Sequence, residues 1–170
     1  MRDILGLGII GASFGSSILS LINYAYFPQV KKLIVYSGSI DNNNGNPKGS
    51  LGIQNYKKAL TEGSVNIQSK TTGKIMTLSK TFFKETRDLK PAEKIKKINL
   101  PILFLHGTED QTTPYEVNKT IAEQCKKSYF ATIKGASHGF HDRTDRLIAV
   151  QYMLRFLQME KIQEKEYDGR

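Results

Sequence analysis

The chain has 170 residues and a formal net charge of +9, from 25 Lys and Arg against 16 Asp and Glu. This length suits one domain with a substantial core, and 39% hydrophobic with 24% charged residues is ordinary for a globular protein. We expect a solvated lysine-rich surface and no nucleic-acid partner, because the basic residues do not gather on one element. They come as scattered pairs: Lys31-Lys32, Lys57-Lys58, Lys96-Lys97 and Lys126-Lys127.

Cysteine usage and the N-terminal segment bear on where the protein acts. The single cysteine, Cys125, cannot form an internal disulfide, which is typical of a reducing compartment. The apolar run from Ile4 to Ile22 superficially matches a signal peptide or a membrane span, but Asp3 interrupts its charged end and glycines and serines dilute it. We therefore expect a cytoplasmic protein with no membrane segment. No Cys/His grouping has zinc spacing, so we expect no metal.

Four short apolar runs predict parallel strands covered on both faces, because such strands lack polar alternation. These runs are Ile4–Ile10, Leu33–Tyr36, Ile102–Leu105 and Tyr129–Ile133. Helical patterns lie between and after these runs, over Ser16–Tyr26, over Pro114–Lys126 and around Leu147 to Leu157. In the second of these helices we expect Thr113 to be the N-cap and Glu116 to complete a capping box. The alternation predicts a three-layer α/β domain over residues 1–159 and a charged tail over 160–170.

About sixty residues, from Ile40 to Asn99, separate the second and third strands, which is too long for a simple crossover. The segment begins with a turn-rich polar run over Asp41–Pro47. We interpret residues 40–99 as an inserted cap, where Phe82 and Phe83 can face a core or an acyl pocket. Its predicted elements are a hairpin of Val65–Gln68 and Lys74–Thr77 and a helix over Leu78–Leu89.

The residues GLGIIGASFG, from Gly6 to Gly15, contain two overlapping motifs. Gly6-x-Gly8-x-x-Gly11 matches the dinucleotide-binding fingerprint, in which glycines let a pyrophosphate approach a helix N-terminus. Gly11-Ala12-Ser13-Phe14-Gly15 matches the G-x-S-x-G nucleophile elbow, a sharp strand-to-helix turn that presents a serine. The fingerprint needs a full strand before Gly6 and an acidic residue after the second strand, where Ser37-Gly38 stands instead. We favour the elbow and keep an NAD(P)-binding oxidoreductase fragment as the alternative.

Two later strands end at the partners that a nucleophilic serine needs. Asp110 follows the third strand and His138 follows the fourth. A serine needs a base to take its proton, and the base needs an acid to orient it. The chain order Ser13, Asp110, His138, each just after a parallel strand, is that of the α/β-hydrolase fold and predicts a triad at one sheet edge. Glu109 is the rival acid, while we expect a structural role for His106 and a surface position for His141.

The stretch LPILFLHGTEDQTTPYE, followed later by GASHGF, resembles the acid and histidine loops of α/β-hydrolases. The resemblance is closest to the cinnamoyl (feruloyl) esterase and serine aminopeptidase-like branches, and LSKTFFKETRDLKPAEKIKKI is similar to the segment before their acid strand. It extends from Ile4 to about Leu157 and departs at Ala12, Ser16 and Ser137, none of which is a triad position. It implies a serine hydrolase that cleaves carboxylic esters, or amides or short peptides, through an acyl-serine, without metal or organic cofactor.

The resemblance also concerns the oxyanion donors. In the family, about four strands and the main oxyanion loop precede the nucleophile strand, whereas the amide of Phe14 can supply one donor here. We therefore expect the chain to be the C-terminal part of such a domain, with impaired activity by itself. Its first strand would expose an edge through which copies could self-associate. A non-catalytic pseudo-hydrolase scaffold is the remaining alternative.

Overall fold

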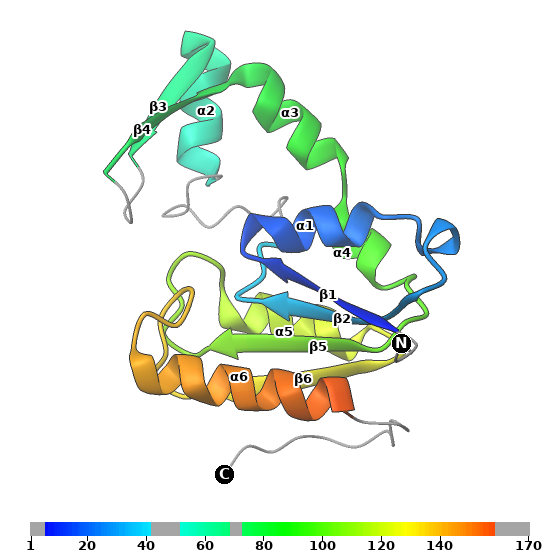
Figure 1. Cartoon of the computed structure of the whole chain (residues 1–170). Coiled ribbons are helices and arrows are strands. Elements are labelled where there is room, and N and C mark those ends of the chain that lie inside the picture. Colours follow the sequence, from blue (N-terminus) through cyan, green and yellow to red (C-terminus); the bar gives the residue numbers. More distant parts are fainter. Residues whose placement is uncertain (1–5, 42–51, 69–72, 159–170) are drawn as a thin grey trace.

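A computed structural model of the chain describes residues 6–41, 52–68 and 73–158 (Figure 1). The predicted tail over 160–170, most of the polar run over 41–47, and the start of the first predicted strand lie outside the described residues. Among the described residues, no helix combines the length and apolar character needed to cross a membrane.

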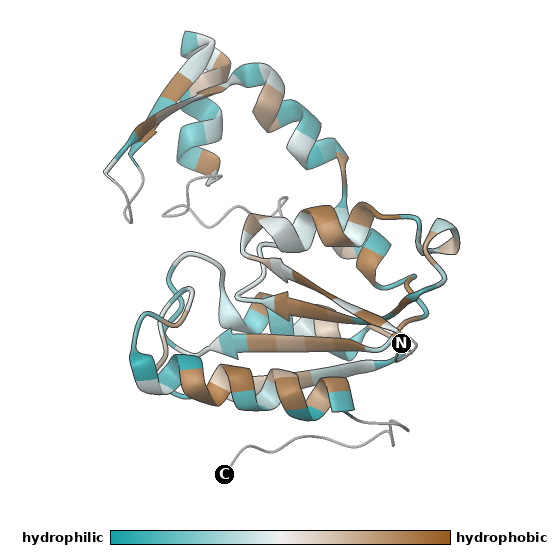
Figure 2. Ribbon diagram, viewed as in Figure 1, coloured by the Kyte–Doolittle hydropathy of each residue, from teal (hydrophilic) through white to brown (hydrophobic). Residues whose placement is uncertain are grey.

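The central sheet has four parallel strands in the order β1-β2-β5-β6 (Figure 1). Alternate residues of its inner strands point to opposite faces, so Leu33 and Val35 join one core cluster while Ile34 joins the other. This explains the unbroken apolar runs, which Figure 2 shows as brown arrows between the helices. The strands are β1 (Leu7–Ala12), β2 (Val30–Tyr36), β5 (Ile102–Gly107) and β6 (Ser128–Ile133).

Helices cover both faces of the sheet and complete the predicted three layers. One core cluster joins the sheet to α1, α4 and α5, through Leu19, Ile95 and Ile121 respectively. The other joins it to α6, through Ala149 and Phe156. The bounds are α1 (Phe14–Leu21), α4 (Pro91–Ile95), α5 (Tyr115–Glu123) and α6 (Arg143–Gln158).

The segment between β2 and β5 forms a separate group of elements. These are α2 (Ile53–Glu62), the antiparallel hairpin of β3 (Ser64–Gln68) and β4 (Ile75–Ser79), and α3 (Lys80–Asp88). They share a small core cluster of their own, formed by Ala59, Val65 and Phe83. Ser79 begins α3 by accepting a hydrogen bond from the amide of Phe82 on its side-chain oxygen, at 3.1 Å. The structure thus contains the predicted hairpin and helix, each close to the expected residues.

Three local expectations are wrong. The helix expected over Ser16–Tyr26 ends at Leu21, and a 3₁₀ turn, η1 (Tyr24–Tyr26), follows because the Asn23 side chain accepts from the Ala25 amide. Thr113 does not cap α5, since Pro114 occupies the N-cap position and Thr113 hydrogen-bonds to Asp110 instead.

The third correction concerns β1, which is an edge strand and not a strand covered on both faces. Among the described residues it pairs with β2 alone, and Leu7 and Ile10 are 43% and 52% exposed. Within the part of the chain that the structure describes, this edge of the sheet is unpaired, as expected. Lys32, which lies opposite Gly8 of β1, donates hydrogen bonds from its Nζ to the carbonyls of Phe156 and Leu157, at 2.7 and 3.0 Å.

Two glycines permit close backbone contacts where strands end. A Cβ built on Gly11, near the end of β1, would lie 2.7 Å from the carbonyl oxygen of Gly15, in the first turn of α1. A Cβ on Gly107 would overlap the backbone carbonyl of Ala136, which brings the ends of β5 and β6 together. Gly15, in contrast, faces open space.

We expect Gly107→Ala to lower the free energy of unfolding by about 1–3 kcal/mol, because the added methyl group must displace backbone atoms. Gly15→Ala is the matched control and should leave the stability unchanged or slightly raised, since it adds the same group in open space within a helix. Urea denaturation of both variants measures the difference. Equal stabilities would contradict the close approach of Gly107 to Ala136.

Candidate active site

Ser13 lies at the sharp turn between β1 and α1. Its backbone angles, φ 47° and ψ −121°, are uncommon for a residue other than glycine. Backbone hydrogen bonds fix this conformation: the Ser13 amide donates to the carbonyl of Tyr36 at 2.9 Å, and the amides of Ser16 and Ser39 both donate to the carbonyl of Ser13 at 3.0 Å. The turn has the strand–serine–helix arrangement of a nucleophile elbow.

The dinucleotide fingerprint does not form at the same residues. β1 runs through Gly8 to Ala12, so Gly8 lies within a strand and not in a turn that could hold a phosphate. A Cβ on Gly8 would meet the side chain of Leu157, and one on Gly6 would meet that of Lys31. Packing against neighbouring side chains therefore accounts for these two glycines.

Asp110 follows β5, and its side chain is fully buried. Its Oδ1 accepts hydrogen bonds from the amides of Thr112 and Thr113, both at 2.9 Å. Its Oδ2 accepts from the Thr113 hydroxyl at 2.9 Å and from Nδ1 of His138 at 2.8 Å. Burial alone would raise the pKa of this carboxyl, but hydrogen bonds from His106, His138 and the Thr113 amide outweigh it and hold the pKa well below its usual range.

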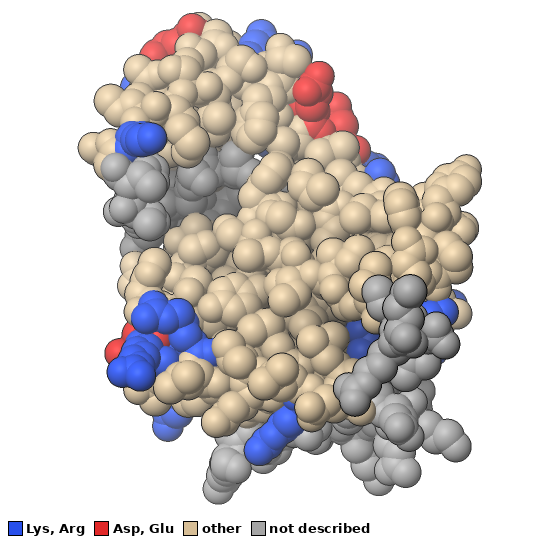
Figure 3. Space-filling model, viewed as in Figure 1, with Lys and Arg blue, Asp and Glu red and all other residues tan. Residues whose placement is uncertain are grey.

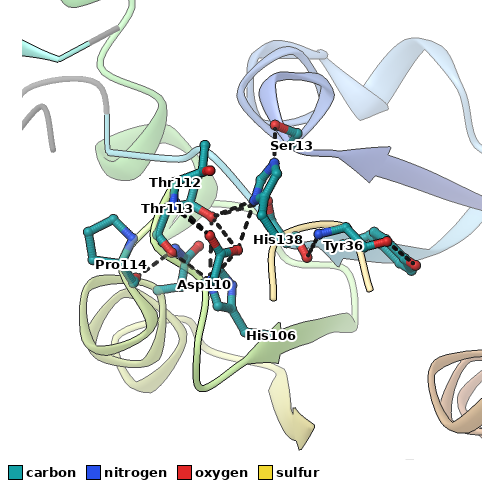
Figure 4. A network of polar contacts seen from close by, with 11 residues as sticks. Ser13, Tyr36, His106, Asp110, Thr112, Thr113, Pro114 and His138 are labelled. Carbon is teal, nitrogen blue, oxygen red and sulfur yellow. Dashed lines mark hydrogen bonds and ion pairs between the residues drawn. The ribbon is translucent and has the colours of Figure 1, made fainter. Parts of the chain in front are cut away.

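His138 lies on the loop after β6 and joins the other two residues (Figure 4). Its Nε2 is 3.0 Å from Oγ of Ser13, and its Nδ1 is 2.8 Å from Oδ2 of Asp110. Because the ionised carboxylate can only accept, Nδ1 carries the proton and Nε2 presents its lone pair to the serine hydroxyl. The three predicted triad residues thus meet at the carboxyl edge of the sheet, connected in the order serine, histidine, acid.

The residues set aside as rivals lie elsewhere or have other contacts. Glu109 is exposed, and its amide donates to the carbonyl of Ala136 at 3.0 Å. His141 is also exposed, as expected, and its carbonyl accepts from the guanidinium of Arg146. His106 is buried, its Nε2 donates to the carbonyl of Thr113 at 2.8 Å, and the same nitrogen lies 3.3 Å from Oδ2 of Asp110.

Sequence reasoning missed three residues that hold the site together. The sequence predicts Thr113 as a helix cap. In the structure its amide and hydroxyl donate hydrogen bonds to Asp110, and its carbonyl accepts one from His106. The spacing Asp110-x-x-Thr113, typical of a side-chain-capped turn, could have indicated this. Tyr36 and Ser37, at the end of β2, hydrogen-bond to the loop of His138, and no local pattern distinguishes them from ordinary strand residues.

Three further observations describe the surroundings of Ser13, Asp110 and His138. The ring of Phe14, next to Ser13, lies 6.2 Å from that of Phe82 on α3, so the segment between β2 and β5 contacts the elbow directly. The described residues contain no group of three or more His, Cys, Asp or Glu able to hold a metal ion. Lys and Arg lie in separate groups on the face seen in Figure 3, among large areas without charge.

Comparisons with known proteins identify the family and the fold. A family model described as TAP-like protein, of the α/β-hydrolase type, matches residues 75–167. The chain is 42% identical over 48 residues to a bifunctional esterase/perhydrolase of Acinetobacter calcoaceticus, covering 28% of the chain and 17% of that protein. It is 36% identical over 64 residues to a proline iminopeptidase of Lactobacillus helveticus, covering 37% of the chain and 21% of that protein.

Solved structures share the fold at low sequence identity. The monoacylglycerol lipase of Paleococcus ferrophilus superposes with a TM-score of 0.70 at 16% identity, over 89% of this chain and 68% of that structure. Est1E from Butyrivibrio proteoclasticus gives 0.67 at 19% identity, over 91% and 62%. The chain thus spans about three fifths of the Est1E structure, and the matches to the curated relatives span about a fifth of their length or less. Because the family model matches more than half of the sequence, the chain belongs to the TAP-like protein family and has the α/β-hydrolase fold.

Proposed function

We propose that this protein is a serine hydrolase that cleaves carboxylic esters through an acyl-serine intermediate. Ser13 is the nucleophile, His138 the general base and acid, and Asp110 the residue that orients His138. The hydrogen-bonded series from Ser13 through His138 to a buried, ionised Asp110 carries the proposal, with distances of 3.0 and 2.8 Å. A serine hydroxyl is a weak nucleophile unless such a base accepts its proton.

In the acylation step, Oγ of Ser13 attacks the ester carbonyl while Nε2 of His138 takes the hydroxyl proton. Asp110 keeps the Nδ1–H tautomer in place and stabilises the imidazolium without itself taking a proton. When the tetrahedral intermediate collapses, the imidazolium gives that proton to the departing alkoxide, and the acyl group stays on Ser13. A water molecule, activated by the same Nε2, then attacks the acyl-serine and releases the acid.

The negative charge that forms on the carbonyl oxygen needs a hydrogen-bond donor. Phe14 is the first residue of α1, so its amide lies at the helix N-terminus, where amide groups have no partner within the helix. We assign the Phe14 amide as one oxyanion donor, as expected for the residue after the nucleophile. The partial positive charge at a helix N-terminus favours the same anion.

The proposed substrates are small carboxylic esters first and amides or short peptides second. The relatives include an esterase and a proline iminopeptidase. Ester bonds and amide bonds can both be cleaved through an acyl-serine intermediate. The contact of Phe82 with Phe14 places an apolar wall beside the nucleophile and favours an apolar group on the substrate. The cytoplasmic location, the absence of a nucleic-acid partner and self-association through β1 stay predictions, as do the bounds of the domain and its cap.

We expect Ser13→Ala and His138→Ala to lower hydrolysis of p-nitrophenyl acetate by about 10⁴-fold or more, and Asp110→Asn by about 10⁴-fold. A fluorophosphonate probe should label the wild-type chain at Ser13, label His138→Ala far less, and leave Ser13→Ala unlabelled. Glu109→Gln is the matched control, because it neutralises the adjacent but exposed carboxylate, and it should retain both activities.

Three outcomes would contradict the assignment. Labelling that persists in Ser13→Ala would place the nucleophile elsewhere. A well-folded wild-type chain that neither turns over ester nor reacts with the probe would indicate the pseudo-hydrolase scaffold. Saturable NAD(P) binding that Gly8→Ala abolishes, without probe labelling, would restore the dinucleotide alternative.

The low pKa of Asp110 predicts how stability depends on pH. A carboxyl with a lower pKa in the folded than in the unfolded chain stabilises the fold above its unfolded pKa of about 3.9, and this stabilisation decreases as the pH falls below that value. We therefore expect Asp110→Asn to be less stable than wild type by on the order of 2 kcal/mol at pH 7, and this gap to narrow between about pH 4 and pH 2. Urea denaturation at several pH values measures the gap. A gap that widens toward acid would contradict the ionised, hydrogen-bonded state of Asp110.

A further inference from the structure

The last residue of β2 and the residue after it contact all three loops that carry the triad. The carbonyl of Tyr36 accepts from the amide of Ser13 at 2.9 Å, and the carbonyl of Ser37 lies 3.4 Å from the hydroxyl of Thr113 in the acid loop. The side chains of both residues hydrogen-bond to Gly139 in the histidine loop. β2 can make these contacts because it lies between β1 and β5 in the sheet.

The contacts to Gly139 hold the peptide units on both sides of one residue. The hydroxyl of Tyr36 donates to the Gly139 carbonyl at 3.3 Å, and the Gly139 amide donates to Oγ of Ser37 at 3.2 Å. Figure 4 shows Tyr36 beside His138. Gly139 directly follows His138, so the second bond restrains the very peptide that links the histidine to the next residue. The Tyr36 ring also packs edge-on against the ring of Phe140, with centroids 4.7 Å apart.

The histidine loop is therefore held at two places, one on each side of His138. On the upstream side, the Gly135 amide donates to the hydroxyl of Thr108 at 2.8 Å, and the Glu109 amide donates to the carbonyl of Ala136 at 3.0 Å. These bonds tie the loop to the acid loop after β5. On the downstream side, the bonds to residues 36 and 37 tie it to the strand that also holds the nucleophile turn.

The backbone at this place is in an unfavourable conformation that the packing maintains. Ser37 and Phe140 have φ angles of 45° and 51°, and they are 1% and 0% exposed. A non-glycine residue in the left-handed region is strained, because its Cβ lies too close to the backbone. Together with Ser13, three of the four such residues in the described chain lie at the site. Strain of this kind persists where the surrounding structure fixes a geometry that function requires.

We propose that Tyr36 and Ser37 are positioning residues that hold the His138 loop so that Nε2 stays within hydrogen-bonding distance of Ser13. The inference rests on the proposed function, since it assigns these residues a role in the same reaction. Their hydroxyl groups act through Gly139 and contact neither the nucleophile nor the acid side chain. A misplacement of about 1 Å can lower turnover by about 10²-fold, so small loop displacements matter.

Two variants remove one hydroxyl each. Ser37→Ala deletes the acceptor for the Gly139 amide, and Tyr36→Phe deletes the donor to the Gly139 carbonyl while keeping the ring against Phe140. We expect each to lower kcat for p-nitrophenyl acetate by about tenfold, with KM changed less than about twofold. Ser20→Ala is the matched control: it deletes another buried serine hydroxyl, bonded to the Ser17 carbonyl at 2.6 Å within α1, and should leave kcat and KM unchanged.

A second measurement does not depend on turnover. The proton shared by Nδ1 of His138 and Asp110 is observable by NMR, and its exchange with water reports how firmly the two groups are held together. We expect faster exchange in Ser37→Ala and Tyr36→Phe than in wild type and Ser20→Ala. A purely structural role would lower the stability of all three serine and tyrosine variants without this selective effect.

Unchanged kcat and unchanged exchange in both site variants would overturn the inference. If Ser37→Ala does not fold, Tyr36→Phe decides the question. If the wild-type chain shows no Ser13-dependent turnover, the proposed function fails, and the exchange measurement by itself then decides whether residues 36 and 37 position His138.

Discussion

The buried carboxylate of Asp110 is the interaction on which the rest of the site depends. A charged group withdrawn from water is stable only when donors surround it, and here the amides of Thr112 and Thr113 satisfy Oδ1 while the Thr113 hydroxyl and His138 satisfy Oδ2. The acid loop must fold around these bonds, which is why Thr113 is unavailable as a helix cap. The same bonds fix the tautomer of His138, so in the proposed reaction this carboxylate determines that the serine proton moves to Nε2 of His138.

The sheet brings these groups together because its strands are parallel. Parallel strands present their carboxyl ends at one edge, so residues 13, 110 and 138, far apart in sequence, follow neighbouring strands in space. Close approaches at Gly11 and Gly107 let the turns after β1 and β5 pack tightly. β2 contributes no triad residue, yet it separates the nucleophile strand from the acid strand and thereby reaches every loop of the site.

The layered fold and the meeting of Ser13, Asp110 and His138 were predictable from the sequence because both have strong local signals. Short apolar runs between helical patterns define the strands, and Gly11-x-Ser13-x-Gly15 with the later Asp110 and His138 defines the order of the chemistry. The exposure of β1 conflicted with its apolar composition, because burial depends on which strands flank it and composition does not. The roles of Tyr36 and Ser37 were not predictable, since they arise from contacts across about a hundred residues of sequence.

The independent core cluster of the segment between β2 and β5 has an evolutionary consequence. Ala59, Val65 and Phe83 pack with one another and not with the two clusters that hold the sheet. Substitutions, insertions or even replacement of this segment can therefore accumulate without unfolding the layer that aligns the triad. The ring of Phe82 in this segment nevertheless lies against that of Phe14, the residue next to Ser13. Under the proposed function, changes in this segment can therefore alter which substrates bind beside Ser13 while the layered domain keeps the proposed triad unchanged.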